Sequence, residues 1–145
     1  MRVLVFGAAG QVGRETFEAA RRRGVALVAL TRAEADLSTP GAAADAVARI
    51  VPDAVINAAA WTAVDKAETE TAAARRLNAE APAEIAAAAA RAGARLVHLS
   101  TDYVFDGSGE RALDETAPTG PLNVYGATKL EGERLVAEGL SSAVI

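Results

Sequence analysis

The segment "VYGATKLEGE", Val124 to Glu133, places a tyrosine and a lysine four residues apart. The whole chain has only two tyrosines and two lysines, so the pairing of Tyr125 with Lys129 is unlike a chance arrangement. On a helix, residues with this spacing lie on one face and can address one ligand. A free phenol has a pKa of about 10, and a neighbouring ammonium favours its ionised form. The spacing predicts that Tyr125 is a general acid or base assisted by Lys129.

Two further polar side chains belong to the strand expected at 95–100 and its end. Thr101 follows that strand, at the carboxyl edge where open α/β folds bind ligands, and its hydroxyl can donate to a substrate carbonyl. The alternative interpretations are a threonine that caps or ends the strand, and a Tyr125–Lys129 pair on a helix surface. His98 lies inside the strand and is interpreted as structural. No spacing typical of metal ligands is present, so no metal site is expected.

A glycine-rich turn follows the first apolar run. "VLVFGAAGQVG" places Gly7, Gly10 and Gly13 between a buried strand and a helix. In such a turn the first glycine permits the tight bend, the second admits a pyrophosphate and the third allows close helix packing. The helix N-terminus adds free N–H groups and positive potential. The pattern predicts dinucleotide binding, whereas the alternative is a turn that only needs glycine.

The end of the second expected strand indicates which dinucleotide binds. An acid there would bind the ribose hydroxyls of the adenosine, but the chain has Thr31 and Arg32, with no acidic neighbour expected at that strand end. A hydroxyl and a guanidinium suit a 2′-phosphate, because arginine binds phosphate through two parallel hydrogen bonds. We therefore expect NADPH, with NADH as a possible second cofactor, and Asp36 and Leu37 bordering the adenine. The alternative is that Arg32 is a solvated surface residue.

Strands and helices alternate along the chain. This order predicts an α/β fold with a doubly wound parallel sheet, helices on both faces, and a single domain over residues 1–145. A loop rich in glycine, proline and acids is expected at 106–123, and a fifth strand is expected to begin at "SSAVI". The strands are expected at 3–6, 25–30, 53–57 and 95–100, and the helices at 11–23, 40–50 (capped by Ser38 or Thr39), 72–77, 82–92 and 125–138.

Composition narrows the classes of partner. The 15 basic and 19 acidic residues give a net charge of −4, which offers no field to attract nucleic acid. The apolar run at the N-terminus stops at Gly7, too short for a signal peptide, and no stretch approaches the roughly 20 residues that span a bilayer. The absence of cysteine excludes disulfides and permits a reducing compartment. We expect a cytoplasmic protein with small-molecule partners, no nucleic acid and no membrane, and a homodimer as one possible assembly.

Four segments together resemble the dTDP-4-dehydrorhamnose reductase family of extended short-chain dehydrogenases/reductases. The glycine motif and the Tyr/Lys pair are shared across that superfamily, whereas the middle two segments are close to specific for the family. In chain order they are "FGAAGQVG" (6–13), "NAAAWTAVDKAE" (57–68), "STDYVFDG" (100–107) and "NVYGATKLEGE" (123–133).

The resemblance implies a Rossmann-like fold and an NAD(P)H-dependent reduction of the C4 ketone of dTDP-4-dehydro-β-L-rhamnose to dTDP-L-rhamnose, a donor for bacterial cell-surface polysaccharide. By position, Tyr125 would protonate the C4 oxygen, Lys129 would hold the nicotinamide ribose, and Thr101 would hydrogen-bond the ketone. The remaining residues match a pyrophosphate segment (Gly10, Gln11, Val12), a loop under the cofactor (Ala60, Trp61, Thr62) and a sugar-nucleotide site (Asp102, Tyr103).

Two departures from the family pattern leave alternatives open. Trp61 stands where the family often has tyrosine or histidine, and family members continue into a C-terminal lobe that supplies much of the sugar-nucleotide pocket, which these 145 residues lack. The chain is therefore expected to be the reductase or its cofactor-binding part. Other interpretations are a non-catalytic NADP-binding regulatory module, a nucleotide-sugar epimerase or dehydratase of the same superfamily, and a fragment that folds imperfectly.

Overall fold

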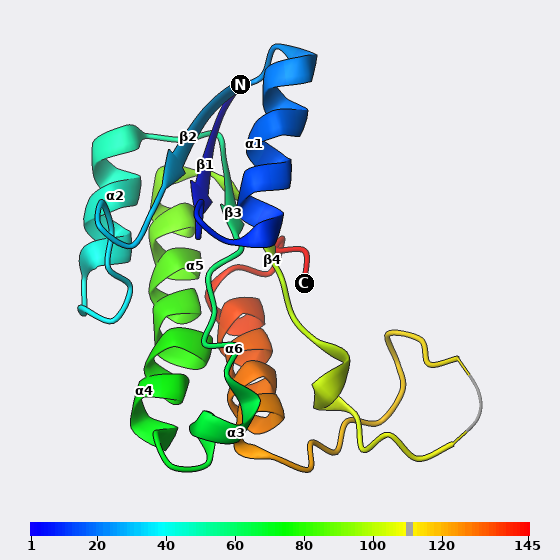
Figure 1. Cartoon of the computed structure of the whole chain (residues 1–145). Helices are drawn as coiled ribbons and strands as arrows, with labels where there is room; N and C mark the ends of the chain where they lie inside the picture. Colours follow the sequence, from blue (N-terminus) through cyan, green and yellow to red (C-terminus); the bar gives the residue numbers. More distant parts are fainter. Residues whose placement is uncertain (110–111) are drawn as a thin grey trace.

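The computed structural model describes residues 1–109 and 112–145, and it is built around a parallel sheet of four strands in the order β2-β1-β3-β4 (Figure 1). The strands are β1 (Arg2–Phe6), β2 (Ala26–Leu30), β3 (Ala54–Asn57) and β4 (Arg95–His98). The helices are α1 (Gln11–Arg23), α2 (Ala42–Ile50), α3 (Val64–Ala67), α4 (Thr71–Arg75), the π-helix η1 (Arg76–Glu80), α5 (Ala81–Ala92), the 3₁₀-helix η2 (Asp102–Val104) and α6 (Val124–Gly139).

Strand β1 is central because its side chains are apolar on both faces. Val3 through Phe6 are all buried, and Val5 pairs in register with Ala29 of β2 and Ile56 of β3. Such a run suits a parallel strand covered by helices on both sides. The expected α/β fold with a doubly wound parallel sheet is confirmed.

Helices cover the two faces of the sheet unequally. Figure 1 shows α1 on one face and α2, α5 and α6 on the other, where α5 packs between α2 and α6. Helix α1 ends at Gly24, whose left-handed φ of 64° closes the helix after three arginines, as its sequence predicts. The apolar cores of α2 and α5 are mostly alanine, so these helices approach one another closely.

The expected break between a helix at 72–77 and another at 82–92 is wrong. Helix α4 continues through η1 into α5, with Pro82 in the first turn of α5. Pro82 has no N–H to donate, and it stands where the π-turn ends and α5 begins. A π-helix is usually found at functional sites, and this one carries the buried Asn78 and Ala79.

Three other expected boundaries differ from the structure. Helix α2 begins after Gly41, which has φ 86°, and is not capped by Ser38 or Thr39; Ser38 instead donates its hydroxyl to Asp36. Strand β4 ends at His98, before the expected Ser100. The expected fifth strand is reduced to a bridge between Val144 and Val97.

The segment that follows β4 leaves the body of the molecule. Residues 106–109 and 112–123 extend outward before the chain returns to α6, as expected for a loop, and residues 110 and 111 of that expectation lie outside the described residues (Figure 1). None of the helices in the described ranges is long and apolar enough to cross a membrane.

Helix α6 lies directly against η1 because Gly132 has no side chain. A Cβ at Gly132 would overlap the backbone carbonyl oxygen of Asn78. We expect Gly132→Ala to destabilise the fold by roughly 1–3 kcal/mol, because the overlapping atom is backbone and cannot rotate away. Urea denaturation measures the loss.

Gly139→Ala is the matched control for this prediction. It makes the same chemical change on the same helix, but its Cβ would lie 3.3 Å from the methyl of Ala86, which is a tight contact without overlap. Equal stability of the Gly132→Ala variant and the parent protein would contradict the close approach of α6 to η1.

Candidate active site

A groove of about 660 Å³ opens at the carboxyl ends of β1, β2 and β3. Nine of the residues predicted to bind cofactor line it, and they come from the glycine turn, the segment after β2 and the segment after β3. These nine are Gly7, Gly10, Gln11, Val12, Arg32, Asp36, Leu37, Ala60 and Thr62. Open α/β sheets bind their ligands at the carboxyl ends of the parallel strands, which is where this groove lies.

The glycine turn has the geometry that its sequence predicts. Gly7 has φ 84°, and its carbonyl oxygen accepts a hydrogen bond from the N–H of Gly10 at 3.0 Å. A Cβ at Gly7 would lie 2.7 Å from the backbone nitrogen of Ala59, and one at Gly13 would overlap the carbonyl oxygen of Gly7. Helix α1 begins at Gly10 without a side-chain cap, so its first N–H groups face the groove unoccupied by the protein's own oxygens. This arrangement fits a pyrophosphate.

Two acids lie at the end of β2, contrary to the expectation of none. The carboxylate of Glu34 accepts hydrogen bonds from the backbone N–H and the hydroxyl of Thr31, both at 2.8 Å. Asp36 accepts one from Nε of Arg32 at 3.2 Å. Hydrogen bonds from Thr31 and Ser38 hold the pKa values of Glu34 and Asp36 below their usual range, so both acids are charged. Thr31 is not among the residues that line the groove.

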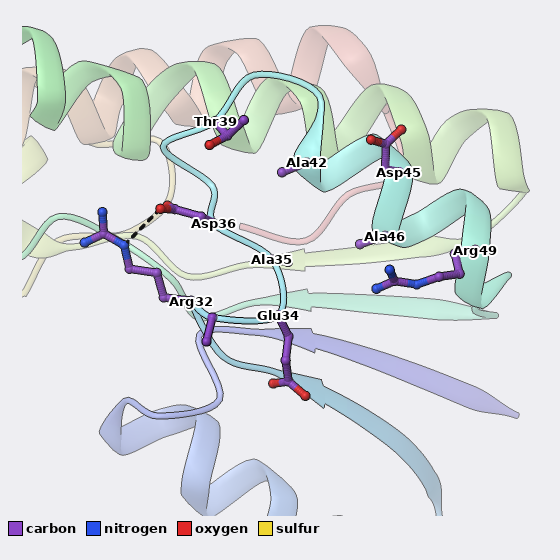
Figure 2. A pocket seen from close by; sticks show the side chains of 10 residues that line it. Arg32, Glu34, Ala35, Asp36, Thr39, Ala42, Asp45, Ala46 and Arg49 are labelled. Carbon is purple, nitrogen blue, oxygen red and sulfur yellow. Dashed lines mark hydrogen bonds and ion pairs between the residues drawn. The ribbon is translucent and has the colours of Figure 1, made fainter.

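Figure 2 shows that Arg32 lies beside Asp36, whereas Glu34 points away from it. Arg32 and Asp36 point toward each other across the start of the loop, while Arg49 reaches in from α2 on the other side of a smaller hollow of about 280 Å³. The Arg32 side chain is 78% exposed, and the ion pair uses its Nε. Its planar guanidinium has two further nitrogens that can bind an anion.

The loop after β3 is tied to η1 by a buried amide. Asn78 accepts a hydrogen bond from the N–H of Trp61 at 2.8 Å and donates one to its carbonyl oxygen at 3.2 Å. The same amide nitrogen lies 3.1 Å from the hydroxyl of Thr128 in α6. The Trp61 indole donates to Ala63 at 2.9 Å. Trp61 is thus held beside the groove but is not part of its lining.

Tyr125 lies next to a residue predicted to bind substrate. Its ring meets that of Tyr103 edge to face, with centroids 5.5 Å apart. Tyr103 and Asp102 line a separate shallow pocket of about 250 Å³. Thr101 caps η2: its hydroxyl donates to Asp102 and accepts from the N–H of Tyr103, both at 3.3 Å. Tyr125 and Tyr103 thus meet near the start of α6, and Thr101 caps η2, whereas the alternative interpretation had it cap or end the strand.

Lys129 is turned into the protein. Its side chain is only 2% exposed, and its ammonium donates to the carbonyl oxygen of Leu99 at 2.5 Å. Burial lowers the pKa of Lys129 to about 8, while the charge of Glu133 raises it. Ser100, the residue after Leu99, donates its hydroxyl to Glu133. The cation Lys129 and the acid Glu133 thus bind two neighbouring residues, Leu99 and Ser100, at the carboxyl edge of the sheet.

His98 is buried below this pair. Its Nδ1 lies 3.0 Å from the side-chain nitrogen of Asn57, whose oxygen accepts from the N–H of Ala59. Because that amide nitrogen is a donor, Nδ1 of His98 is the acceptor and the ring is neutral. Burial, followed by the charge of Lys129, lowers the pKa of His98 to about 4. The structural interpretation of His98 agrees with these contacts.

Several residues of the site were not found by sequence reasoning. Asn78 gave no signal, because a π-turn has no sequence pattern that distinguishes it from an α-helix. Glu133 did give one, since it stands four residues after Lys129 on the same helix. Glu68 accepts from the N–H of Val124 and Asn123 from that of Gly126, so both cap α6; Asn123 has the residue type expected at that position.

The sheet order, the glycine turn and the groove define a dinucleotide-binding type of doubly wound α/β protein. Within that class, the chain belongs to the family described as the RmlD substrate binding domain, whose model matches residues 1–145. The resemblance stated from its motifs is confirmed.

Three of the similar proteins are dTDP-4-dehydrorhamnose reductases. The chain is 51% identical over 139 residues to a dTDP-4-dehydrorhamnose reductase of Streptomyces griseus, covering 96% of this chain and 46% of that protein. Solved reductases of the same name from Clostridium acetobutylicum and Bacillus anthracis match it with TM-scores of 0.95 and 0.93 at 38% and 34% identity. They cover 99% and 98% of this chain, which is 51% and 50% of those chains. The chain therefore spans about half the length of its relatives.

The burial of neutral His98 predicts how the stability of the fold depends on pH. The unfolded state binds a proton near pH 6.5, whereas the folded state binds it near pH 4. The unfolded state is thus more protonated between these values, so stability falls as pH falls through this window, by on the order of 3 kcal/mol. Urea denaturation of the parent and of His98→Gln at pH 4 to 7 measures the effect.

The difference between the two stability curves isolates the histidine from the carboxylates, which titrate in both proteins. We expect the parent to lose more stability than His98→Gln on acidification, although the variant is less stable at pH 7. Parallel curves would show that His98 is not buried in its neutral form.

Proposed function

We propose that this chain is the cofactor-binding and acid–base part of an NADPH-dependent reductase that converts dTDP-4-dehydro-β-L-rhamnose to dTDP-L-rhamnose. One observation carries the proposal: Tyr125, with Tyr103 against its ring, lies at the same carboxyl edge of the sheet as the glycine-lined groove. A proton donor and a dinucleotide site at one edge are what the reduction of a ketone requires. The names of the reductases that match this chain supply the sugar.

The groove fits a nicotinamide dinucleotide by its shape and its donors. Gly10, Gln11 and Val12 would face the pyrophosphate, and Leu37 with Asp36 would border the adenine. Gly13 serves by letting α1 approach β1. Ala60, Trp61 and Thr62 form the loop under the cofactor, with Trp61 positioned by Asn78. When bound, NADPH supplies the hydride for the ketone carbon.

The residues of α6 and η2 would handle the oxygen of the ketone. Tyr125 donates its phenolic proton to the C4 oxygen as that oxygen gains charge, and Lys129 assists the phenol electrostatically. To hold the nicotinamide ribose as well, Lys129 must turn its ammonium from the carbonyl oxygen of Leu99 toward the cofactor. Thr101 must rotate its hydroxyl from Asp102 to donate to the ketone. Asp102 and Tyr103 meet the sugar nucleotide. The product leaves as an alcohol, and the Tyr125 phenolate is then reprotonated.

Arg32 would favour NADPH over NADH, and Thr31 would contribute only if its hydroxyl left Glu34. The solved reductase of Bacillus anthracis is in complex with NADP. Here the free guanidinium nitrogens of Arg32 are suited to a 2′-phosphate, while Glu34 holds Thr31 in place. A single domain over residues 1–145, a cytoplasmic location and a homodimer remain predictions.

Tyr125→Phe tests the proposed acid. We expect NADPH consumption at 340 nm with dTDP-4-dehydrorhamnose to fall by about 10² to 10⁴, because the phenolic proton is lost. The Kd for NADPH, measured by its fluorescence, should change little. Consumption by the parent alone supports the reductase, and NADPH binding without consumption supports the cofactor-binding part. Absence of NADPH binding by the parent would overturn the proposal.

Arg32→Ala tests the cofactor preference. We expect the Kd for NADPH to rise about tenfold, the equivalent of roughly 1.4 kcal/mol, and the Kd for NADH to stay the same. Arg49→Ala is the matched control, because Arg49 lines only the smaller hollow beside the groove. An equal loss of both cofactors in Arg32→Ala would show that Arg32 does not read the 2′-phosphate.

A further inference from the structure

Two residues of α6 are fastened to two consecutive residues after β4. Lys129 donates to the carbonyl oxygen of Leu99, and Glu133, one turn further along α6, accepts from the hydroxyl of Ser100. Residues four apart on a helix lie on one face, so both side chains address the same short segment. Tyr125 occupies the same face one turn before Lys129.

Lys129 carries its charge at a place where little compensates it. The side chain is 2% exposed, and the carbonyl of Leu99 is a neutral acceptor. His98, which faces it from β4, is held neutral by Asn57. A buried ammonium without a nearby anion tends to lose its proton.

Most carboxylates on α6 and on the elements packed against it pair with other groups, and Asp65 of α3 and Glu138 near the end of α6 are exposed. Glu133 lies on the same face of α6 as Lys129, and the hydroxyl of Ser100, the residue after Leu99, orients its carboxylate toward the segment that Lys129 binds. The paired carboxylates are Glu131 and Glu80 with Arg75, Glu84 with Arg76, Glu68 with the N–H of Val124, and Asp102 with Thr101.

We propose that Glu133, oriented by Ser100, is a positioning residue that keeps the buried Lys129 ammonium charged beside Tyr125. The catalytic consequence rests on the proposed function, in which Lys129 assists the phenol. Glu133 itself lines neither the groove nor the shallow pocket of Asp102 and Tyr103. It acts through Lys129. The charge of Glu133 raises the pKa of Lys129, whereas burial lowers it.

The two lysines of the chain make a direct test simple. Lys129 is buried, whereas Lys66 is exposed in α3 and serves as an internal control. The protein is labelled with ¹³C and ¹⁵N only at lysine, and the NMR signals from the side-chain ends of Lys66 and Lys129 are followed from pH 6 to 11. We expect the midpoint of Lys129 to fall by about one pH unit in Glu133→Gln, and that of Lys66 to stay unchanged.

Two further variants separate the charge from a general loss of structure. Ser100→Ala releases Glu133 and should lower the midpoint of Lys129 by a smaller amount. Glu131→Gln removes a carboxylate two residues away that pairs with Arg75, and it should leave the midpoint unchanged. If Glu133→Gln does not fold, Ser100→Ala decides by itself. An unchanged Lys129 midpoint in the folded Glu133→Gln protein, or in Ser100→Ala where that variant alone is available, overturns the proposal.

The titration needs neither cofactor nor substrate, so its failure is distinct from failure of the proposed function. A shifted midpoint in a protein that does not bind NADPH would keep the role of Glu133 and reject the reductase. Where the parent consumes NADPH, the alkaline limb of its pH profile should move to lower pH in Glu133→Gln by the same interval as the Lys129 midpoint. An unmoved limb would show that the charge of Lys129 does not serve Tyr125.

Discussion

The side-chain amide of Asn78 connects the two halves of the candidate site. Its oxygen and nitrogen bind both backbone groups of Trp61, beside the groove, and its nitrogen also reaches Thr128 of α6, beside Tyr125. The amide is completely buried, so a lost partner would leave a polar group without water. Gly132 permits this geometry by letting α6 rest on the backbone of Asn78. The distance between the groove and the proposed acid therefore depends on one residue.

The charges of the site depend on which titratable groups the fold buries and on what those groups contact. His98 ends β4 and Lys129 binds the next residue, Leu99, so two buried bases lie near one strand end, but their surroundings differ. An amide donor keeps the ring of His98 neutral, whereas Lys129 has a carbonyl and an acid nearby. Of these two bases, Lys129 is therefore the one that can carry a positive charge at neutral pH, one helical turn after Tyr125. Two adjacent charges of the same sign would repel each other strongly in this environment.

Local patterns were predictable and long-range contacts were not. The strand 3–6, the glycine turn and α1 could be predicted because glycine spacing, apolar residues and the terminal arginines act within about 20 residues. The ion pair of Arg32 with Asp36 was missed although its partners are close in sequence, because the expectation considered only the strand end. The contact of Ser100 with Glu133 spans 33 residues, and only the paired fold reveals it. The same holds for Asn78, since the π-turn arises from packing against α6.

The π-turn at Arg76–Glu80 is equivalent to one extra residue within a continuous helix from Thr71 to Ala92. Deleting a residue there would give a more regular helix, yet it would rotate α4 by about 100° relative to α5. The apolar face of α4 would then leave α6, and the Asn78 amide would leave Trp61. A regular helix in this segment would therefore disrupt the site. The segment should tolerate substitutions on its outer face but not a change in length.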